Sequence, residues 1–296
     1  MATCDVCVHL SDIMTPLSFS SLITTLIKYL VYEKQLIPYP YDRLKLYVQK
    51  YKELNFEQEN SRCNQKSKYR LESEKYYKKV SDAVQSLETV FQCIENEFLS
   101  HVENHIESVV ILIGSSVLNP LTVFNINVPE LSYSHCEKQH SSRQHIDNVF
   151  RNILNNDKFN DILTSNIMVE TNLYVMFKVK KGGKMATNWC VPKEQFRSFR
   201  GKQVVLRFDQ PQNEINSKKY ETCCIKDCLN FEVFVDFDNQ ETSVQTLQTL
   251  NNTFTNSVVD WYLGKHHITG FKNYKYNGIP ISDTWLNPTI IDRLVS

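Results

Sequence analysis

The sequence predicts an α+β fold, in which helices cover one face of a mainly antiparallel sheet. In the first half of the 296 residues, apolar side chains recur at helical spacing, and in much of the second half they alternate with polar ones. Between these regions the run Val109–Ile113 is wholly apolar and is followed by Gly114. Such a short run is typical of a strand buried on both faces, so we expect the helices to pack against it.

Helical spacing is strongest from Val80 to Val102, where apolar residues three and four positions apart form the stripe of a long helix. An earlier helix is predicted with Ser18 as its cap, and it ends at the extended segment around Pro38 and Pro40. The predicted helices span residues 18–30, 41–47, 80–102 and 142–155.

Alternating apolar residues predict the strands, which follow the buried run Val109–Ile113. The predicted strands span residues 122–128, 168–181, 204–208, 231–237 and 258–263. We expect one domain at residues 17–273, with a charged excursion at 55–78. Residues 1–16 are interpreted as an N-terminal extension, and residues 274–296 as a C-terminal tail that docks loosely or not at all.

Charge and cysteine usage exclude several classes of protein. Lys plus Arg and Asp plus Glu each number 33, so a charged field broad enough to hold nucleic acid or an anionic membrane is not expected. The nine cysteines are odd in number and do not resemble a secreted disulfide framework. With neither a signal peptide nor a membrane span visible, we expect a reduced, soluble, intracellular protein.

Motifs for catalysis are also missing from the sequence. A Gly-Ser-Ser stretch at Gly114 lacks the lysine of a phosphate loop, and there is no nucleophile elbow or zinc-protease motif. Cys4 and Cys7 together with the group Cys223, Cys224 and Cys228 leave a zinc site as a weaker alternative to unpaired thiols. We therefore predict a protein that is not an enzyme and has no cofactor.

Several stretches resemble the comet family, whose members bind the spindle-checkpoint protein Mad-two. The resemblance rests on QLIPYPYDRLK at residues 35–45, VVILIGSSVLNP at 109–120, VFRNI at 149–153, the Trp189-x-x-Pro192-Lys193 motif and Gly270-Phe271. These stretches occur in the family's order and span most of residues 20–273.

The resemblance implies a HORMA fold, with three helices packed on the sheet and a C-terminal safety-belt segment across its edge. It implies an adaptor that binds the closed form of Mad-two and recruits a hexameric AAA+ ATPase of the Pch-two type. The ATPase converts Mad-two to its open form, which disassembles the mitotic checkpoint complex and silences the checkpoint. The implied location is the nucleus and cytoplasm, with association with the spindle or kinetochore in mitosis.

The same resemblance assigns three groups of residues to partners. Phe150, Arg151, Leu154 and Glu33 are assigned to Mad-two; Trp189, Pro192 and Lys193 to the ATPase; and Trp261, Gly270 and Phe271 to the belt. For Trp189 the alternative is a place in the core. Helical geometry agrees for Phe150 and Leu154. Ile146, Val149 and Ile153 form a core stripe, and Phe150 and Leu154 lie about 100° around the helix from Val149 and Ile153, the residues that precede them. The alternative is that a wide stripe buries all five side chains.

A second function remains open at this point. Other HORMA proteins clamp a linear peptide under the belt and act in the meiotic chromosome axis or in DNA-repair signalling. The resemblance implies that in this chain the belt segment takes the place of the bound peptide, so the adaptor is the preferred interpretation.

Overall fold

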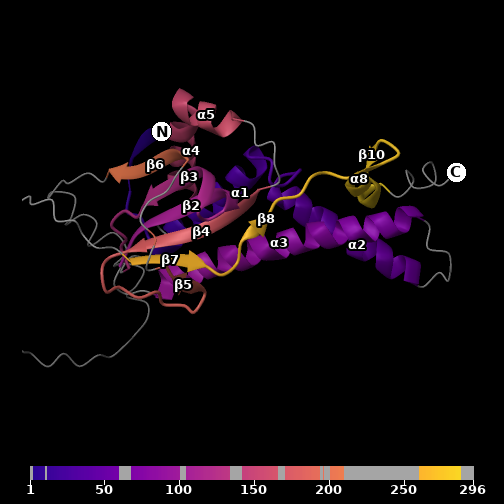
Figure 1. Cartoon of the computed structure of the whole chain (residues 1–296), viewed down its shortest axis with the longest axis horizontal. Coiled ribbons are helices and arrows are strands. Elements are labelled where there is room, and N and C mark those ends of the chain that lie inside the picture. The colour runs from indigo at the N-terminus through magenta and orange to yellow at the C-terminus, as the bar shows by residue number, and fades with distance from the viewer. Residues whose placement is uncertain are drawn as a thin grey trace, which may run out of the picture.

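The computed structural model describes residues 3–10, 12–59, 68–100, 105–133, 142–165, 171–193, 196, 201–209 and 260–287. It confirms the α+β class: helices lie on one face of a large, mainly antiparallel sheet, and a pair of helices projects beyond the sheet (Figure 1). The strand predicted at residues 231–237 lies outside the described residues. None of the helices in the described ranges has the length and apolar character needed to cross a membrane.

The main sheet has the strand order β1-β6-β3-β2-β4-β7-β5, and β8 pairs with β4 beside β7. Its pairings are antiparallel except at β6, which runs parallel to both β1 and β3. The strands are β1 (Thr3–His9), β2 (Ile106–Ser116), β3 (Asn119–Asn127), β4 (Asn172–Val179), β5 (Cys190–Pro192), β6 (Lys202–Asp209), β7 (Asp260–Gly264) and β8 (Ile268–Thr269).

Strand β2 lies at the centre of this sheet and is buried on both faces, as its sequence predicts. Val109, Ile111 and Ile113 belong to the core between the sheet and the helices. Val110 and Leu112 point to the other face and form a second, smaller core. Because side chains alternate along a strand, five consecutive apolar residues are needed to satisfy both cores.

Helices α1 (Pro16–Glu33) and α3 (Lys68–Ser100) supply most of the helical cover. Phe19 of α1 and Phe98 of α3 meet edge to face, with ring centroids 5.1 Å apart. The cap of α1 is Thr15, whose hydroxyl accepts from the backbone N–H of Ser18, so Ser18 lies inside the helix rather than at its cap. Pro16 begins the helix, where its missing N–H costs nothing.

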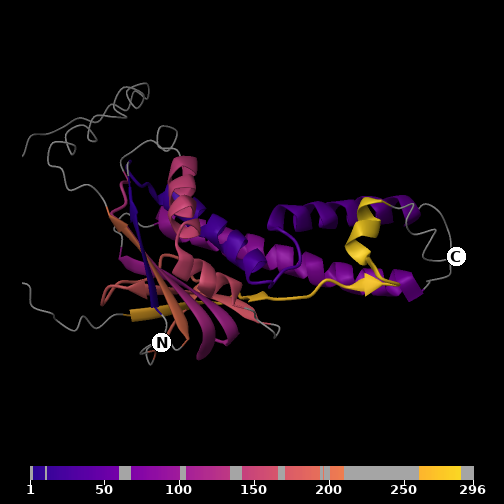
Figure 2. The ribbon, with the colours of Figure 1, turned by 90° about the horizontal axis from the view of Figure 1, so that it is seen from above.

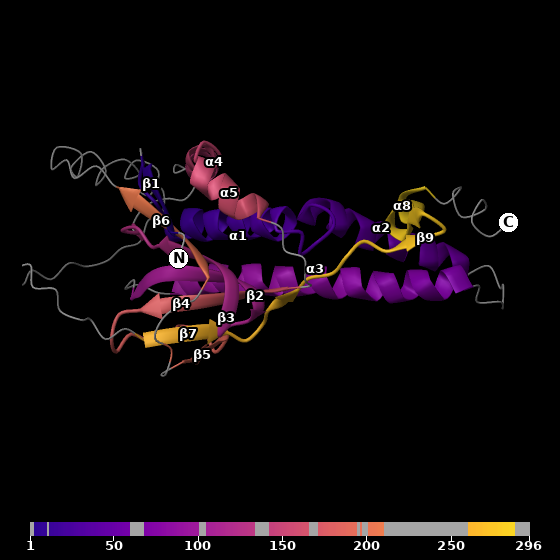
Figure 3. The ribbon, with the colours of Figure 1, turned by 45° about the horizontal axis from the view of Figure 1, so that its top comes forward.

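Two further helices, α4 (Ser142–Leu154) and α5 (Asp157–Thr164), follow each other near the β1 side of the sheet (Figure 3). Helix α4 contacts both α1 and β1. The resemblance implied three helices, whereas the described residues contain six.

A helical arm extends beyond the sheet and includes part of the predicted charged excursion 55–78. Helix α2 (Tyr41–Glu59) runs alongside the first half of α3, which begins at Lys68 (Figure 2). The rings of Tyr51 and Tyr77 stack between them at 4.0 Å. Within the described part of this segment, residues 68–78, the charged side chains lie on the sides of α3 that are exposed or partly exposed.

The prediction that residues 1–16 form an N-terminal extension is wrong, because β1 is an edge strand of the main sheet. Cys4, Val6 and Val8 point into the core, and the strand pairs with β6 from Thr3 to His9. The alternation is visible in the sequence, but its partner strand is nearly 200 residues away.

The tail predicted at residues 274–296 also differs from the structure up to Asn287. Strands β9 (Lys275–Tyr276) and β10 (Ile279–Pro280) form a hairpin, and helix α8 (Ile281–Leu286) follows it. The side chains of Ile281 and Trp285 are buried against the arm. This part of the tail is docked tightly rather than loosely.

The role of β1 can be tested by placing a charge on either of its faces. Val6→Asp is expected to lower the free energy of unfolding by about 3 kcal/mol or more, because it buries an unpaired carboxylate. Cys7→Asp is the matched control; its side chain is on the exposed face, so a loss below about 1 kcal/mol is expected. Urea unfolding measures both, and an unchanged Val6→Asp variant would show that β1 is dispensable.

Candidate partner-binding surfaces

Helix α4 presents one apolar face to the core and leaves a second group of side chains accessible. Val149 and Ile153 are buried, and Phe150 is partly buried. Leu154 lies one turn beyond Phe150 and is 49% exposed, and Arg151 is exposed. The alternative, in which a wide stripe buries all five apolar side chains of this helix, is therefore wrong.

Helix α1 completes this surface from the other side. The ring of Phe150 meets that of Tyr29 edge to face, with centroids 5.2 Å apart and an interplanar angle of 89°. Burial and the nearby carboxylate of Glu33 raise the pKa of Tyr29. We call Tyr29, Glu33, Phe150, Arg151 and Leu154 the α1/α4 face. It combines two aromatic rings, one exposed leucine and charges of both signs.

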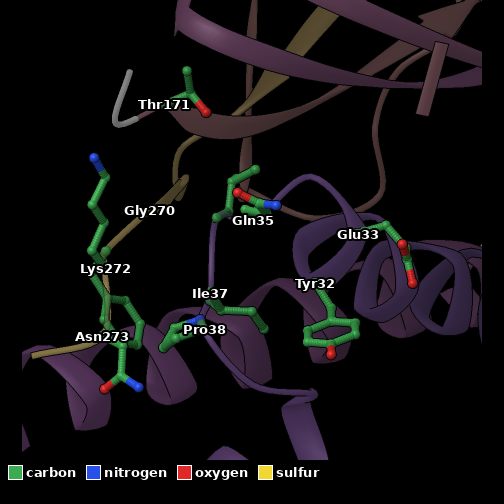
Figure 4. Close-up of a pocket in the computed structure, with 11 residues that line it drawn as sticks. Tyr32, Glu33, Gln35, Ile37, Pro38, Thr171, Gly270, Lys272 and Asn273 are labelled. Carbon is green, nitrogen blue, oxygen red and sulfur yellow. The ribbon is translucent and has the colours of Figure 1, made fainter. Parts of the chain in front are cut away.

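A groove opens beside this face, where the chain leaves α1 (Figure 4). Its volume is about 500 Å³. Tyr32 and Glu33 lie on one side of it and Lys272 on the other, as Figure 4 shows. The buried side chains of Leu36 and Ile37 also line it. A partner that reaches Glu33 would therefore also meet a groove with charged rims, which sequence spacing alone did not reveal.

Lys34 connects the end of α1 to α5 from within the protein. It is only 3% exposed, and its ammonium donates to the carbonyl of Ile162 and, at 3.3 Å, to Ser165 Oγ. Burial, with a smaller effect of Lys202, lowers the pKa of Lys34 to about 8. A cation beside the last carbonyls of a helix also favours the helix dipole. Lys34 thereby fixes α5, the neighbour of α4, relative to α1.

The three residues that the resemblance assigns to the ATPase differ in exposure: one is buried and two are exposed. Trp189 is buried, packs edge to face on Phe177 at 5.7 Å and lies against Gly264, where a Cβ would be 2.7 Å from the ring. Its ring is thus part of the core. The assignment of Trp189 to direct contact with the ATPase is therefore corrected. Pro192 and Lys193 are exposed.

Pro192 and Lys193 are held in place by the edge of the sheet. Strand β5 pairs with β7, and the N–H of Lys193 donates to the carbonyl of Trp261 at 2.6 Å. The loop that precedes β5 is fixed by the buried carboxylate of Glu97, which accepts the N–H of Thr187 at 3.1 Å and that of Ala186. The two exposed side chains are therefore carried on a rigid support.

The predicted belt segment lies along the edge of β4. Strand β7 pairs antiparallel with β4 over residues 260–263, and β8 pairs with Asn172 and Leu173 of the same strand. The ring of Trp261 packs on Phe196, Gly270 approaches the backbone of Leu36 and Thr171, and Phe271 is buried. The three predicted belt residues thus lie on one continuous segment at the sheet edge.

The weaker zinc alternative gains no support from strand β1. Cys4 is buried and Cys7 is exposed, so the two thiols point to opposite faces of the strand. Among the described residues, no group of three or more His, Cys, Asp or Glu side chains has the arrangement of a metal site. Cys223, Cys224 and Cys228 lie outside the described residues.

Comparison with known families identifies the family of the chain. The model of the p31comet family, described as "Mad1 and Cdc20-bound-Mad2 binding", matches residues 14–245. The chain belongs to the p31comet family. Membership assigns it binding of Mad2, the Mad-two of the resemblance, in the spindle checkpoint. The family is defined by binding rather than by a reaction. A search of curated proteins found no match.

The buried amine of Lys34 predicts a pH dependence of stability. The native pKa of about 8 lies below the ordinary value of 10.5. Between these values the unfolded chain binds a proton that the native protein has lost, so the free energy of unfolding rises with pH. Below pH 8 both states bind the proton and the contribution is constant. Urea unfolding of wild type and Lys34→Met between pH 7.5 and 9.5 should show a steeper rise for wild type; equal slopes would contradict it.

Proposed function

We propose that this protein is a non-enzymatic adaptor that binds closed Mad2 through the α1/α4 face. In this proposal it presents Mad2 to a hexameric AAA+ ATPase of the Pch-two type, which converts Mad2 to the open form. The mitotic checkpoint complex is thereby disassembled and the checkpoint is silenced. The observation that carries the proposal is the accessible Phe150–Leu154 edge of α4 in a chain of a Mad2-binding family.

The chemistry of the α1/α4 face supports a protein partner. Binding energy in protein interfaces is concentrated in a few aromatic and arginine side chains that are surrounded by weaker contacts. Phe150 is braced by Tyr29, so little rotamer freedom would be lost when a partner covers it. Arg151 and Glu33 supply charges at the rim, where they favour orientation over affinity.

The position of the two surfaces supports an adaptor. Helix α4 contacts β1, which is one edge of the sheet, whereas β5 with Pro192 and Lys193 is the other edge. Figure 3 shows α4 and β5 on opposite sides of the molecule. A protein that contacts Pro192 and Lys193 therefore need not compete with one that covers Phe150. Simultaneous binding of substrate and ATPase is what an adaptor requires.

The belt supports the adaptor over the peptide clamp. Strands β7 and β8 pair directly with β4, so the chain's own segment covers the sheet edge. We also propose that the protein occurs in the nucleus and cytoplasm and joins the spindle or kinetochore in mitosis, where its partner complex acts.

The Mad2 surface is tested by a binding measurement with purified closed Mad2. Phe150→Ala is expected to raise the dissociation constant about 30-fold, which corresponds to about 2 kcal/mol for an aromatic hot spot. Gln144→Ala is the matched control: it lies on the same helix about 120° around from Phe150 and should bind as wild type does. An unchanged dissociation constant for Phe150→Ala would remove this residue from the interface.

The ATPase surface is tested by a separate assay. Pro192→Ala combined with Lys193→Glu should slow ATPase-stimulated conversion of Mad2 by about tenfold or more, because it alters the exposed edge of β5. Affinity for Mad2 should not change, since this edge is distant from α4. Lys180→Glu reverses an exposed charge outside β5 and serves as the control. Loss of both activities in the double variant would argue against a dedicated ATPase surface.

A further inference from the structure

The C-terminal anchor, which we define as residues 275–286, is attached to the helical arm through Trp285. The indole is 2% exposed and is surrounded by tyrosine rings from both helices of the arm. Its centroid lies 5.0 Å from Tyr51, 5.6 Å from Tyr76, 6.1 Å from Tyr77 and 6.3 Å from Tyr47. Aromatic packing of this kind adds stabilisation beyond the apolar area that it buries.

Hydrogen bonds fix helix α8, which carries Trp285, in one position on the arm. Four consecutive residues of α8 each have a side-chain partner outside the anchor. Ser282 donates to Tyr39 at 3.2 Å, Asp283 accepts from Tyr47 at 3.1 Å, Thr284 pairs with Tyr69, and the indole of Trp285 donates to Ser73 at 2.9 Å. Burial and the carboxylate of Asp283 raise the pKa of Tyr47 to about 12, so its hydroxyl remains a donor.

The segment between β8 and the anchor is pinned along its length. The N–H of Gly270 donates to Thr171 at 3.0 Å, and that of Phe271 donates to Leu36 at 2.7 Å. Asn273 bridges Tyr39 at 2.8 Å and Tyr76 at 3.2 Å. Figure 2 shows this segment running from the sheet edge along α3 to the end of the arm. The anchor and β8 are therefore joined by a short segment that is itself hydrogen-bonded to the rest of the protein.

Strand β7 is the short strand that joins β5 to the rest of the sheet. It is five residues long, and four of its residues are only partly buried. Four of its residues pair with β4, and β8 adds two more pairs. In the described residues, β5 has β7 as its strand partner, so β5 depends on the position of β7.

We infer that Trp285 is a positioning residue: by fixing the anchor in the arm, it holds the belt strands β7 and β8 on β4 and thereby sets the position of β5. Docking of α8 keeps the belt strands at high effective concentration next to β4, so their short pairing does not open. The part of this inference that concerns β5 rests on the proposed ATPase surface, whereas the holding of β7 does not.

Hydrogen exchange of the full chain tests this inference. Trp285→Ala should increase exchange of the β7 and β8 amides about tenfold or more, together with those of α8. Leu286→Ala is the matched control, since this neighbouring side chain is 41% exposed; it should exchange as wild type does. Amides of β2 report global unfolding and should remain protected. Fast exchange in α8 with wild-type protection in β7 and β8 would overturn the inference.

If Trp285→Ala also increases exchange of the β2 amides, the whole protein is unfolding, and a milder variant is then needed to test the inference. Trp285→Phe keeps a ring among the tyrosines but loses the hydrogen bond to Ser73, so it should give intermediate exchange in α8, β7 and β8 with β2 protected. Faster exchange confined to α8 would again overturn the inference.

The consequence for β5 has its own readout. Trp285→Ala should slow ATPase-stimulated conversion of Mad2 without changing Mad2 affinity, and Trp285→Phe should restore part of the rate. If the exchange result holds but substitution of Pro192 and Lys193 has no effect, the proposed ATPase surface fails and the anchor stands. Unchanged stimulation by Trp285→Ala, with Pro192 and Lys193 required, would overturn the positioning of β5.

Discussion

Strand β2 must be covered on both of its faces, and the other elements are arranged to meet that requirement. Helices α1 and α3 bury the side that carries Val109, Ile111 and Ile113. Neighbouring strands supply Val123 and Met176 to the other side, and partly buried side chains such as Trp261 cover them. Because exposing either side would return a row of large apolar groups to water, this strand fixes where helices and belt can lie.

The two proposed surfaces depend on that core in different ways. Phe150 follows directly from the packing of α4, because Val149 and Ile153 turn inward and leave the next side chain at the boundary. Pro192 and Lys193 depend on a longer chain of contacts, through β7, the buried ring of Trp189 and the carboxylate of Glu97. The proposed Mad2 surface thus rests on the packing of one helix, whereas the proposed ATPase surface rests on contacts among several elements at a sheet edge.

The sequence is informative where an element buries its own periodic stripe. The long helix after Val80 and the strand at Val109–Ile113 are predicted because many residues repeat the same signal. The side of α4 that carries Phe150 follows from the same geometry. The family resemblance agrees with the family match, which covers residues 14–245 and so includes the stretches from residue 35 to Lys193.

Prediction failed where a partner lies far away in the chain. Cys4, Val6 and Val8 alternate as a strand should, but pairing with β6 could not be read from seven residues. Trp189 is a single side chain without a period, so its burial depends on Phe177 and Gly264. Trp285 becomes part of the core only because the two arm helices bring four tyrosines together.

The parallel pairing of β6 between β1 and β3 has a consequence for synthesis of the chain. Strand β1 is complete at His9, whereas its partner is complete only at Asp209. At typical rates of about 5–20 residues per second, the interval is roughly 10–40 s. During that time the backbone N–H and C=O groups of β1 that pair with β6 lack their native partner, so the nascent chain carries an unpaired strand edge until β6 emerges.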